Sequence, residues 1–438
     1  MKAYPKYKDS GVEWIGEIPT HWGISKLKHQ TQFINGCPFK PAEWNDTGTP
    51  IIRIENLNGG TSFNCYTGEV NERYHVNFGD LLFAWSGNIG TSFGPFLWQK
   101  EGKYYLNQHI FKLSGYVLDK AFFYRLLKAV TVYVESKAHG IIGLVHVTKG
   151  ELGGVEIPAV SLPEQQSIAT YLDRKTKQID GLIKKKQNQI DLLLEQRTAV
   201  INEAVTKGLN PKAKMKDSGI EWIGEIPAHW NVGQLKHVAA SIQTGPFGSQ
   251  LHAEDYIDDG IPVINPSNME NGKIIHSRKC CVDDLMYEHL IKHRLSEGDV
   301  VFARRGEMGR CALVTDVEDG WLCGTGSLRL RLNNSRVIPS YIAQFLSTEA
   351  SINWLKLESV GTTMDNLNTD IMARIPVIIP PKDEQQQIVS HVDYTIYQFD
   401  FLMTKEERLI ELLQEYRTSL ISEVVTGKVD VRDVRSEN

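Results

Sequence analysis

Two glycine-rich loops hold the residues of this chain that are best suited to hydrogen bonding. One follows the apolar segment 79–84 and runs WSGNIGTS over residues 85–92, and the other follows segment 298–303 and runs RRGEMGR over residues 304–310. Ser, Asn and Thr side chains bond to base edges, and the planar guanidinium of Arg pairs with guanine or phosphate. Both loops therefore favour DNA binding. For any single residue, an ordinary solvated turn is the alternative.

Further candidate contacts lie in basic stretches. Residues 90–150 hold eight Lys or Arg against three acids, which favours a surface that follows phosphates, although a solubilising helix face is the alternative for residues 120–137. Asn88 and Gln108 suit adenine, and Glu307 suits the amine of cytosine. The predicted DNA contacts are Arg53, Ser86, Asn88, Thr91, Ser92, Lys103, Gln108, His109, Arg278, Lys279, Lys292, Arg294, Arg304, Arg305, Glu307, Arg310 and Arg329.

Catalytic motifs are weak by comparison. Residues 265–268 (NPSN) match the Asn-Pro-Pro-aromatic loop of amine methyltransferases only in part. Asp80 with Glu101 and Lys103 fits a nuclease pattern that is too common to be informative. There is no GxxxxGK[ST] phosphate loop, and residues 324–327 (GTGS) lack the third glycine of a dinucleotide fingerprint. We therefore predict no catalytic residues, no metal site and no cofactor in this chain.

The frame that holds the loops occurs twice in the sequence. Residues 8–29 and 216–237 are identical at 16 of 22 positions at an offset of 208, and residues 190–206 return as 410–426 at an offset of 220. Between these repeats the two halves, residues 30–160 and 238–380, share little beyond scattered apolar and glycine positions. Such a chain is expected to bind two copies of one partner through its repeated parts and two different targets through its unlike parts.

The closing repeats predict two long amphipathic helices. Pro163 and Pro381 stand just before the two starts, and Gly208 and Gly427 supply stops. Neither helix is apolar all round, so we expect the two to pack together as an antiparallel coiled coil. About 40 residues span about 60 Å, which suits a spacer, and a long core helix is the alternative. The predicted apolar stripes are Ile168, Leu172, Ile179, Leu182, Ile190, Leu193, Val200 and Ala204, and Ile388, Val392, Phe399, Met403, Ile410, Leu413, Leu420 and Val424.

The unlike halves predict two mixed α/β modules. Each should have three strands followed by a helix, at 51–54, 80–84, 110–113 and 120–137 in the first module and at 261–264, 299–303, 327–331 and 340–357 in the second. The expected fold class is mixed α/β, with two globular domains joined by the two long helices in an internal pseudo-twofold duplication. The expected boundaries are 1–162, 163–208, 209–380, 381–428 and a tail at 429–438.

Composition limits the function classes only loosely. A length of 438 residues suits two or more domains, and the net charge of -5 means that any nucleic-acid binding must come from local patches. Six cysteines without a CxxC pair are expected to be reduced thiols. The start of the chain has no signal-peptide pattern, and no segment approaches about 18 apolar residues, so we expect a soluble, cytoplasmic protein.

The repeated SGxEWIGEIPxHW segment, the PEQQ and PKDEQQ entries into the long helices, and the Arg-Thr and Val-Thr endings resemble the specificity subunit of Type I restriction-modification enzymes. The resemblance covers essentially the whole chain. It implies that each variable module is a target recognition domain for one half of a split, asymmetric double-stranded DNA site. It also implies that the helices set the spacing and dock two modification subunits, which use S-adenosylmethionine to methylate adenine, while separate restriction subunits, the motor-nucleases, cleave.

Two other function classes stay open at this point. In a protein scaffold the unlike modules would bind proteins, and binding would lack the steep salt dependence of phosphate contacts. A stand-alone nuclease or methyltransferase would show activity from the isolated chain with magnesium or S-adenosylmethionine, which we predict to be absent.

Overall fold

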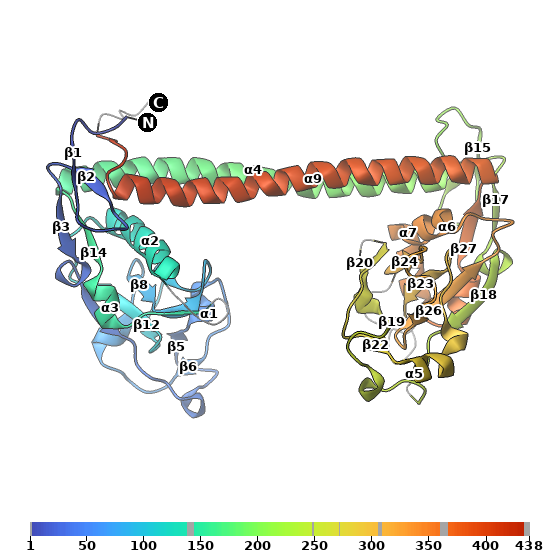
Figure 1. The fold of residues 1–438 in the computed structure, drawn as a ribbon, viewed down its shortest axis with the longest axis horizontal. Helices are drawn as coiled ribbons and strands as arrows, with labels where there is room; N and C mark the ends of the chain where they lie inside the picture. The colour runs from blue at the N-terminus through green and yellow to red at the C-terminus, as the bar shows by residue number, and fades with distance from the viewer. Residues whose placement is uncertain are drawn as a thin grey trace. The chain divides into compact units, whose positions relative to one another are not determined.

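The computed structural model describes residues 2–137, 144–247, 249–270, 272–304, 309–359 and 367–432. It divides into two compact units, the first formed by Met1–Gln187 with Arg408–Asn438 and the second by Asn188–Glu407. The predicted mixed α/β fold with two modules and two long helices is confirmed. These helices are α4 (Leu162–Lys207) and α9 (Lys382–Val425), drawn in green and red in Figure 1.

The first module is built on two four-stranded sheets. One is antiparallel in the order β10 (Gly94–Leu97), β8 (Leu81–Ala84), β12 (Ile110–Ser114) and β4 (Gln32–Asn35). The other runs β6 (Cys65–Tyr66), β5 (Thr49–Ile52), β11 (Tyr104–Leu106) and β7 (His75–Val76), with β11 parallel to β5. Helix α2 (Lys120–Lys137) lies between the first sheet and the long helices (Figure 1). Smaller elements are β1 (Tyr7–Asp9), β2 (Glu17–Pro19), β3 (Gly23–Lys26), α1 (Ile54–Leu57), β9 (Ser86–Asn88), β13 (Leu144–His146), α3 (Lys149–Gly154) and β14 (Glu156–Ala159).

The second module repeats this plan with one strand fewer in its second sheet, where an isolated bridge between Arg294 and Leu322 stands in the place of β7. Its antiparallel sheet has the order β18 (Ala239–Thr244), β26 (Ser327–Leu332), β23 (Val300–Ala303) and β24 (Cys311–Leu313). Its second sheet runs β22 (Cys281–Val282), β19 (Ile261–Ile264) and β25 (Leu322–Cys323), with β25 parallel to β19. Around these lie β15 (Met215–Asp217), β16 (Glu225–Pro227), β17 (Asn231–Gln234), β20 (Met269–Glu270), β21 (Lys273–Ile274), α5 (Asp284–His289), α6 (Pro339–Leu346), α7 (Glu349–Ser359), α8 (Thr369–Arg374) and β27 (Pro376–Ile379).

The same turn starts the matched central strand in both modules. Asp80 accepts a hydrogen bond from the backbone of Asn77 at 2.9 Å, and Asp299 accepts one from Ser296 at 2.8 Å. The glycine before each aspartate has a φ of +83°, a conformation that only glycine adopts without strain. The strands that follow, β8 and β23, are buried along their whole length. The two modules therefore share one frame, as the sequence predicts.

Each end of the long helix pair belongs to the core of one unit. In the first unit the start of α4 packs beside the end of α9, and Arg417 forms an ion pair with Asp180 at 2.8 Å. In the second unit the end of α4 packs beside the start of α9, and Arg197 pairs with Asp400 at 3.4 Å. Both arrangements are antiparallel. Burial of the apolar stripes within each core holds the helices in place.

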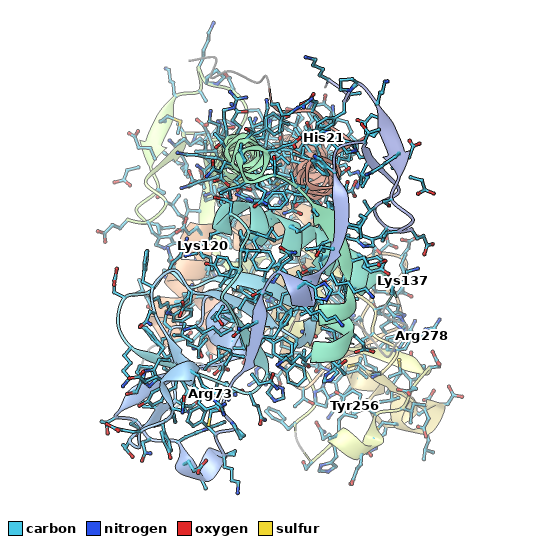
Figure 2. All side chains as sticks on the ribbon, turned by 90° about the vertical axis from the view of Figure 1, so that its left-hand side faces the viewer. His21, Arg73, Lys120, Lys137, Tyr256 and Arg278 are labelled. Carbon is cyan, nitrogen blue, oxygen red and sulfur yellow. The ribbon has the colours of Figure 1, made fainter. Side chains whose placement is uncertain are left out.

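A tryptophan of each opening repeat packs against these helix ends. Trp22 is buried against the end of α9 in the first unit, and Trp230 against the end of α4 in the second. The predicted glycine stops are confirmed, since Gly208 and Gly427 have φ values of +75° and +79°. His21, from the first opening repeat, lies 3.1 Å from Glu164, which is in the first turn of α4 (Figure 2). The second repeat has the same histidine–glutamate pair.

Three details of the sequence prediction are wrong. The predicted helix 340–357 is two helices, α6 and α7, because the hydroxyls of Ser347 and Thr348 donate to the carbonyls of the preceding turn, both at 2.8 Å, and end α6. Ile54 starts the short helix α1 instead of ending a strand. Leu182 is 47% exposed, and the neighbouring Ile183 packs against the core instead.

Candidate nucleic-acid interface

The two modules differ in chemistry at the residue that directly follows the shared central strand. Trp85 follows β8, and its carbonyl accepts from the backbone of Val147 at 2.9 Å. Arg304 follows β23, and its carbonyl accepts from Leu367 at 3.0 Å. The backbone is thus held in the same way in both modules while the side chain changes from an indole to a guanidinium. We call the surroundings of Trp85 the first tip and those of Arg304 the second tip.

The first tip combines aromatic and polar side chains. The Trp85 ring lies 5.3 Å from the ring of His109 and 4.7 Å from that of His146, and its indole N–H donates to the carbonyl of Gln108 at 3.0 Å. Strand β9 pairs with β13, which sets Ser86 opposite His146. The structure thus brings together five predicted contacts, of which all except the half-buried Ser86 are exposed: Ser86, Asn88, Thr91, Gln108 and His109.

Ser92 shapes this loop from within. Its side chain is buried, and its hydroxyl oxygen accepts from the backbone N–H of Asn88 at 2.7 Å. A buried hydroxyl with this bond has no surface to offer a base. The prediction that Ser92 contacts DNA is therefore replaced by a structural role in the loop.

Arg53 lies beside the first tip because β5 and β11 run in parallel and end at the same edge. Its guanidinium lies 4.6 Å over the ring of Trp44 and donates to Asn64 at 2.6 Å, and it pairs with Glu55 at 3.0 Å. The half-buried guanidinium is thus held in one orientation. At the equivalent edge of the second module, the amide of Asn265 donates to Tyr256 at 3.2 Å. This is a second position where shared backbone carries unlike chemistry.

The second tip has arginine and phenylalanine in place of the Trp and His cluster. Arg310 is half-buried and donates to the carbonyl of Pro266 at 3.2 Å. Arg304 is buried, donates to the carbonyl of Leu367 at 3.1 Å, and lies 5.8 Å from the ring of Phe247, which is 59% exposed. Arg304 thus supports the tip from below, and Phe247 is the side chain offered to solvent. The predicted contacts Arg305 and Glu307 lie outside the described residues.

Arg329 also has an internal role. It is buried in β26 and donates to the carbonyl of Arg294 at 2.6 Å and to the side chain of Gln243 at 2.5 Å. The register of the matched strands places Lys112 of β12 at the same position, where its ammonium donates to the carbonyl of His75 at 2.7 Å. A cation that donates to the equivalent carbonyl in both modules is part of their shared frame. The prediction that Arg329 reads DNA is therefore not supported by its position.

The other predicted cations lie away from the tips or on flanking surface. Lys103 is exposed just before β11, at the end of that strand opposite Gln108. Arg278 and Lys279 are exposed near the start of β19, and Arg278 lies 3.6 Å from Asp259. Lys292 and Arg294 are exposed in a short helical turn, where Arg294 lies 3.5 Å from Asp319. These side chains fit sequence-neutral contacts better than base recognition.

The basic stretch at residues 90–150 does not form a single positive face. Lys120 and Lys137 lie at opposite ends of α2 (Figure 2). Lys137 pairs with Glu13 at 3.0 Å, and Arg125 pairs with Asp173 of α4 at 2.7 Å. The solubilising and structural interpretation therefore fits α2 better than phosphate contact does.

Sequence reasoning missed four tip residues. His146 and Phe247 come from segments far along the chain from the loops, and no local pattern marks them. Trp85 and Asn265 were visible, because each directly follows a strand that the two modules share. Among the described residues, no cluster of three or more His, Cys, Asp or Glu is placed to hold a metal ion, and no helix is long and apolar enough to cross a membrane.

Comparison with known proteins places this architecture in a family. A family model described as "Type I restriction modification DNA specificity domain" matches residues 19–192 and again residues 227–412. The chain belongs to the Type I restriction-modification DNA specificity family. Each match takes in one module together with much of the long helix that follows it, so the internal duplication is a duplication of the specificity domain.

Relatives of full length have the same description. The chain is 23% identical over 430 residues to the Type I restriction enzyme MjaVIII specificity subunit of Methanocaldococcus jannaschii, covering 95% of both chains. It is 24% identical over 442 residues to the EcoBI specificity subunit of Escherichia coli, covering 98% of this chain and 90% of that one. A chain solved in work on complex assembly and conformational transition of the type I system has a TM-score of 0.67 at 14% identity, covering 94% of this chain and 99% of that chain, and supports the fold alone.

Proposed function

We infer that this protein is the specificity subunit of a Type I restriction-modification enzyme and that it recognises a bipartite, asymmetric DNA site. One observation carries the proposal: two specificity domains hold unlike side chains on a shared backbone frame. Equivalent positions such as Trp85 and Arg304 place different hydrogen-bonding and stacking groups at the two tips. Two unlike readers on one frame imply two unlike half-sites.

The chemistry of the first tip favours base recognition. Asn88 and Gln108 offer the paired donor and acceptor that suit adenine, and the exposed ring of His109 beside Trp85 offers stacking and a hydrogen bond. At the second tip Arg310 and the exposed Phe247 are the corresponding groups. We propose that Asn88, Thr91, Gln108, His109 and Arg310 contact bases, while Lys103, Arg278, Lys279 and Lys292 contact phosphates.

The protein acts in this proposal as a non-catalytic adaptor. Two modification subunits dock on the repeated parts, where the opening repeat and the helix ends present nearly the same residues twice. Restriction subunits join the same complex. Methyl transfer and cleavage belong to these partners, and the specificity subunit determines where on the DNA they act.

Methylation mapping tests the proposal. Adenine methylation is mapped genome-wide in cells that express the modification subunit with and without this chain. A bipartite motif that appears only with the chain is expected, and replacement of residues 30–160 by another reader should change one half of the motif only. Methylation without the chain, or a replacement that changes both halves, contradicts the proposal.

The spacer role of α4 and α9 has its own test. Inserting about four residues into each helix lengthens the pair by about 6 Å, which is near two base pairs at about 3.4 Å each. The unread gap in the methylated motif should grow by about two base pairs. Insertion of the same residues in the loop after Gly208 is the matched control and should leave the gap unchanged.

The salt dependence of binding distinguishes a protein scaffold from a DNA-binding protein. Fluorescence anisotropy of the reconstituted complex on its mapped site should show affinity falling steeply between about 50 and 200 mM salt, because bound phosphates release counterions. A salt-independent affinity would favour the scaffold. Methyl transfer or cleavage by the purified chain alone would instead place chemistry within it.

A further inference from the structure

A shared turn follows β5 in the first module and β19 in the second. The backbone N–H of Arg53 donates to the side chain of Asn56 at 2.9 Å. In the same way, the N–H of Asn265 donates to the side chain of Asn268 at 3.0 Å. Both acceptor asparagines are buried, and the amide of each donates to a backbone carbonyl further along the chain. Arg53 and Asn265 therefore occupy equivalent positions, where the backbone is shared and the side chain is not.

Each of these two residues has an aromatic partner, and the partners are equivalent as well. At nine residues before the turn, the first module has Trp44 and the second has Tyr256. The guanidinium of Arg53 lies 4.6 Å from the centre of the Trp44 ring. The amide of Asn265 donates to the hydroxyl of Tyr256 at 3.2 Å. We call Trp44 with Arg53 the first turn pair, and Tyr256 with Asn265 the second turn pair.

Both turn pairs lie beside the side chains that the proposed function assigns to base contact. Strand β11 is parallel to β5 and the two end together, so Arg53 and Gln108, which follow these strands, lie at one edge of the sheet. In the second module, Arg310 donates at 3.2 Å to the carbonyl of Pro266, the residue directly after Asn265. DNA that reaches the tips is therefore within reach of the turn pairs.

The first turn pair holds a guanidinium with one edge unused. The Nη1 of Arg53 donates to Asn64 at 2.6 Å and lies 3.0 Å from a carboxylate oxygen of Glu55. The ring of Trp44 covers one face of the group. Among the described residues, Nε and Nη2 have no hydrogen-bond partner, and the side chain is 32% exposed. Two parallel N–H donors on a fixed plane match the O6 and N7 acceptors of guanine.

The second turn pair holds an amide that retains one donor and one acceptor. One N–H of Asn265 is donated to Tyr256, and its Oδ1 has no partner among the described residues. Gly324 leaves the room that this amide occupies, because a Cβ at that position would lie 2.2 Å from Oδ1. The first module has Asn107 in place of this glycine. An amide with a free oxygen and a free N–H matches the N6 amine and the N7 acceptor of adenine.

We propose that each turn pair reads one base, with Arg53 reading a guanine of the first half-site and Asn265 an adenine of the second. Trp44 and Tyr256 are positioning residues that fix the plane of the reading group. A side chain that is already oriented loses less conformational entropy on binding than a free one, which favours base recognition over a loose phosphate contact. The inference rests on the proposed function and assigns one base in each half of its bipartite site.

Competition binding with base analogues tests the assignment in the complex reconstituted with the modification subunit. Each guanine of the first half-site is replaced in turn by 7-deazaguanine, and each adenine of the second by 7-deazaadenine, which lack the N7 acceptor. At one position in each half-site the analogue should weaken binding about three- to tenfold, as expected for half of a bidentate contact. With Arg53→Lys or Asn265→Ala, the analogue at that position should cost nothing further.

Conservative variants separate base recognition from charge and from support. Arg53→Lys keeps the positive charge and loses the fork, so discrimination at the guanine should fall about 10- to 100-fold while binding to phosphates is retained. Tyr256→Phe removes only the hydroxyl that orients the amide. It should relax discrimination at the same adenine as Asn265→Ala does, by a smaller factor, and at no other position.

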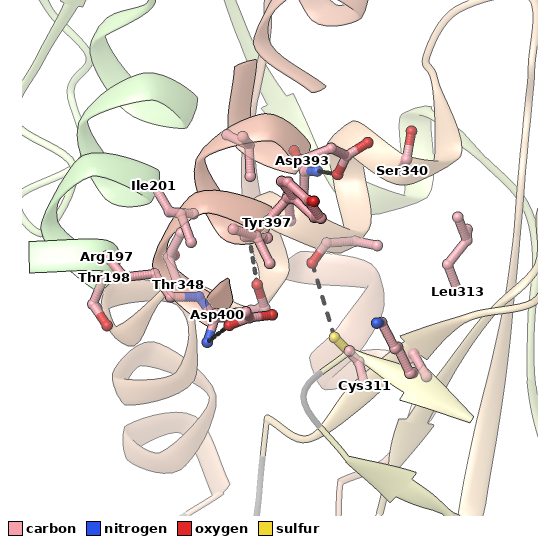
Figure 3. Close-up of a pocket in the computed structure, with 18 of the residues that line it drawn as sticks. Arg197, Thr198, Ile201, Cys311, Leu313, Ser340, Thr348, Asp393, Tyr397 and Asp400 are labelled. Carbon is pink, nitrogen blue, oxygen red and sulfur yellow. Dashed lines mark hydrogen bonds and ion pairs between the residues drawn. The ribbon is translucent and has the colours of Figure 1, made fainter. Parts of the chain in front are cut away.

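Gln344→Ala is the matched control for Asn265→Ala. Gln344 is also a half-buried amide of the second unit, and it donates to Asp393 of α9 at 2.9 Å. This bond lies in a groove of about 790 Å³ lined by α9, the end of α4, α6 and β24, where Figure 3 shows Asp393. Loss of this amide should leave discrimination at both half-sites unchanged.

Three results would overturn the inference. Arg53→Lys could keep full discrimination, no analogue could weaken binding of the wild type, or Asn265→Ala could relax every position of its half-site as a general support of the loop would. Each of these leaves a bipartite motif in place. The absence of a bipartite motif would instead contradict the proposed function itself.

Discussion

The tips of the two specificity modules differ in which side chains are exposed to bind bases and which are buried and support the loop. In the first module Trp85 is half-buried and stands among exposed polar groups, whereas in the second the equivalent Arg304 is buried beneath an exposed phenylalanine. Below that residue the two frames agree in the turn before the central strand, in strand register and in the position of one cation, Lys112 or Arg329. Specificity can therefore change at the tips without a change in the frame. The predictions below test where the boundary between frame and tip lies.

The largest effect is expected at a glycine that both frames share. A Cβ added to Gly36 would lie 1.9 Å from the carbonyl oxygen of Asn107, and one added to Gly245 would lie 1.9 Å from that of Gly324. We expect Gly36→Ala and Gly245→Ala each to lower the free energy of unfolding of their own unit by about 2–4 kcal/mol, because two backbone segments must separate. Hydrogen-exchange mass spectrometry assigns the loss to a unit.

The control for this pair is Gly181→Ala in α4, where an added Cβ meets nothing within 4 Å. It should be neutral or stabilise by up to about 1 kcal/mol, since alanine favours the helix. If only one of the two frame glycines is sensitive, the frames are less alike than their registers indicate.

A smaller loss is expected from Lys112 and Arg329, the matched cations of the two sheets. Lys112→Met and Arg329→Met each leave a partly buried carbonyl without its side-chain donor, which costs about 1–3 kcal/mol. Exchange should speed up in β12 or β26, and the recognised half-site should keep its sequence. A changed half-site with unchanged exchange protection for Arg329→Met would return that arginine to the set of base readers.

These two cations also show where prediction from sequence stops. The strands, the long helices and the doubled plan were predictable, because apolar periodicity and the repeat leave few alternatives. The internal hydrogen bonds of Arg329 could not be predicted, because a strand pattern gives the face on which a side chain lies but not the carbonyl to which it donates. Phe247 and His146 were missed because packing that brings distant loops together leaves no local signal.

At the tips the expected effect falls on recognition and not on stability. Asn88→Ala and Gln108→Ala should each reduce discrimination at one half-site by about 1–3 kcal/mol, because a paired donor and acceptor are lost from an exposed side chain. Anisotropy competition between the mapped site and single-base variants measures this. Lys103→Ala is the matched control and should weaken binding to every sequence alike while reducing the salt slope. Equal effects of all three would mean that the first tip holds DNA without reading it.

The smallest expected effect is a pH dependence of stability that is present in the second unit and absent from the first. Burial, with the nearby positive charges of Lys292 and Arg329, lowers the pKa of His293 to about 4. The Nδ1 of its ring lies 3.5 Å from the side-chain amide of Gln243, and a backbone hydrogen bond at Thr244 offsets the lowering only in part. The unfolded chain takes up this proton near pH 6.5 and the folded chain only near pH 4. Stability is therefore complete above about pH 6.5 and is lost as pH falls towards 4.

The aligned residue of the first module is Tyr74 and not a histidine, so the pH effect of His293 should be confined to the second unit. Between pH 7 and pH 5 its free energy of unfolding should fall by up to about 2 kcal/mol, seen as faster hydrogen exchange in β26 while β12 changes little. His293→Gln removes the titrating group and should flatten this dependence. A variant that remains as pH-sensitive as the wild type would show that another group of the second frame takes up the proton.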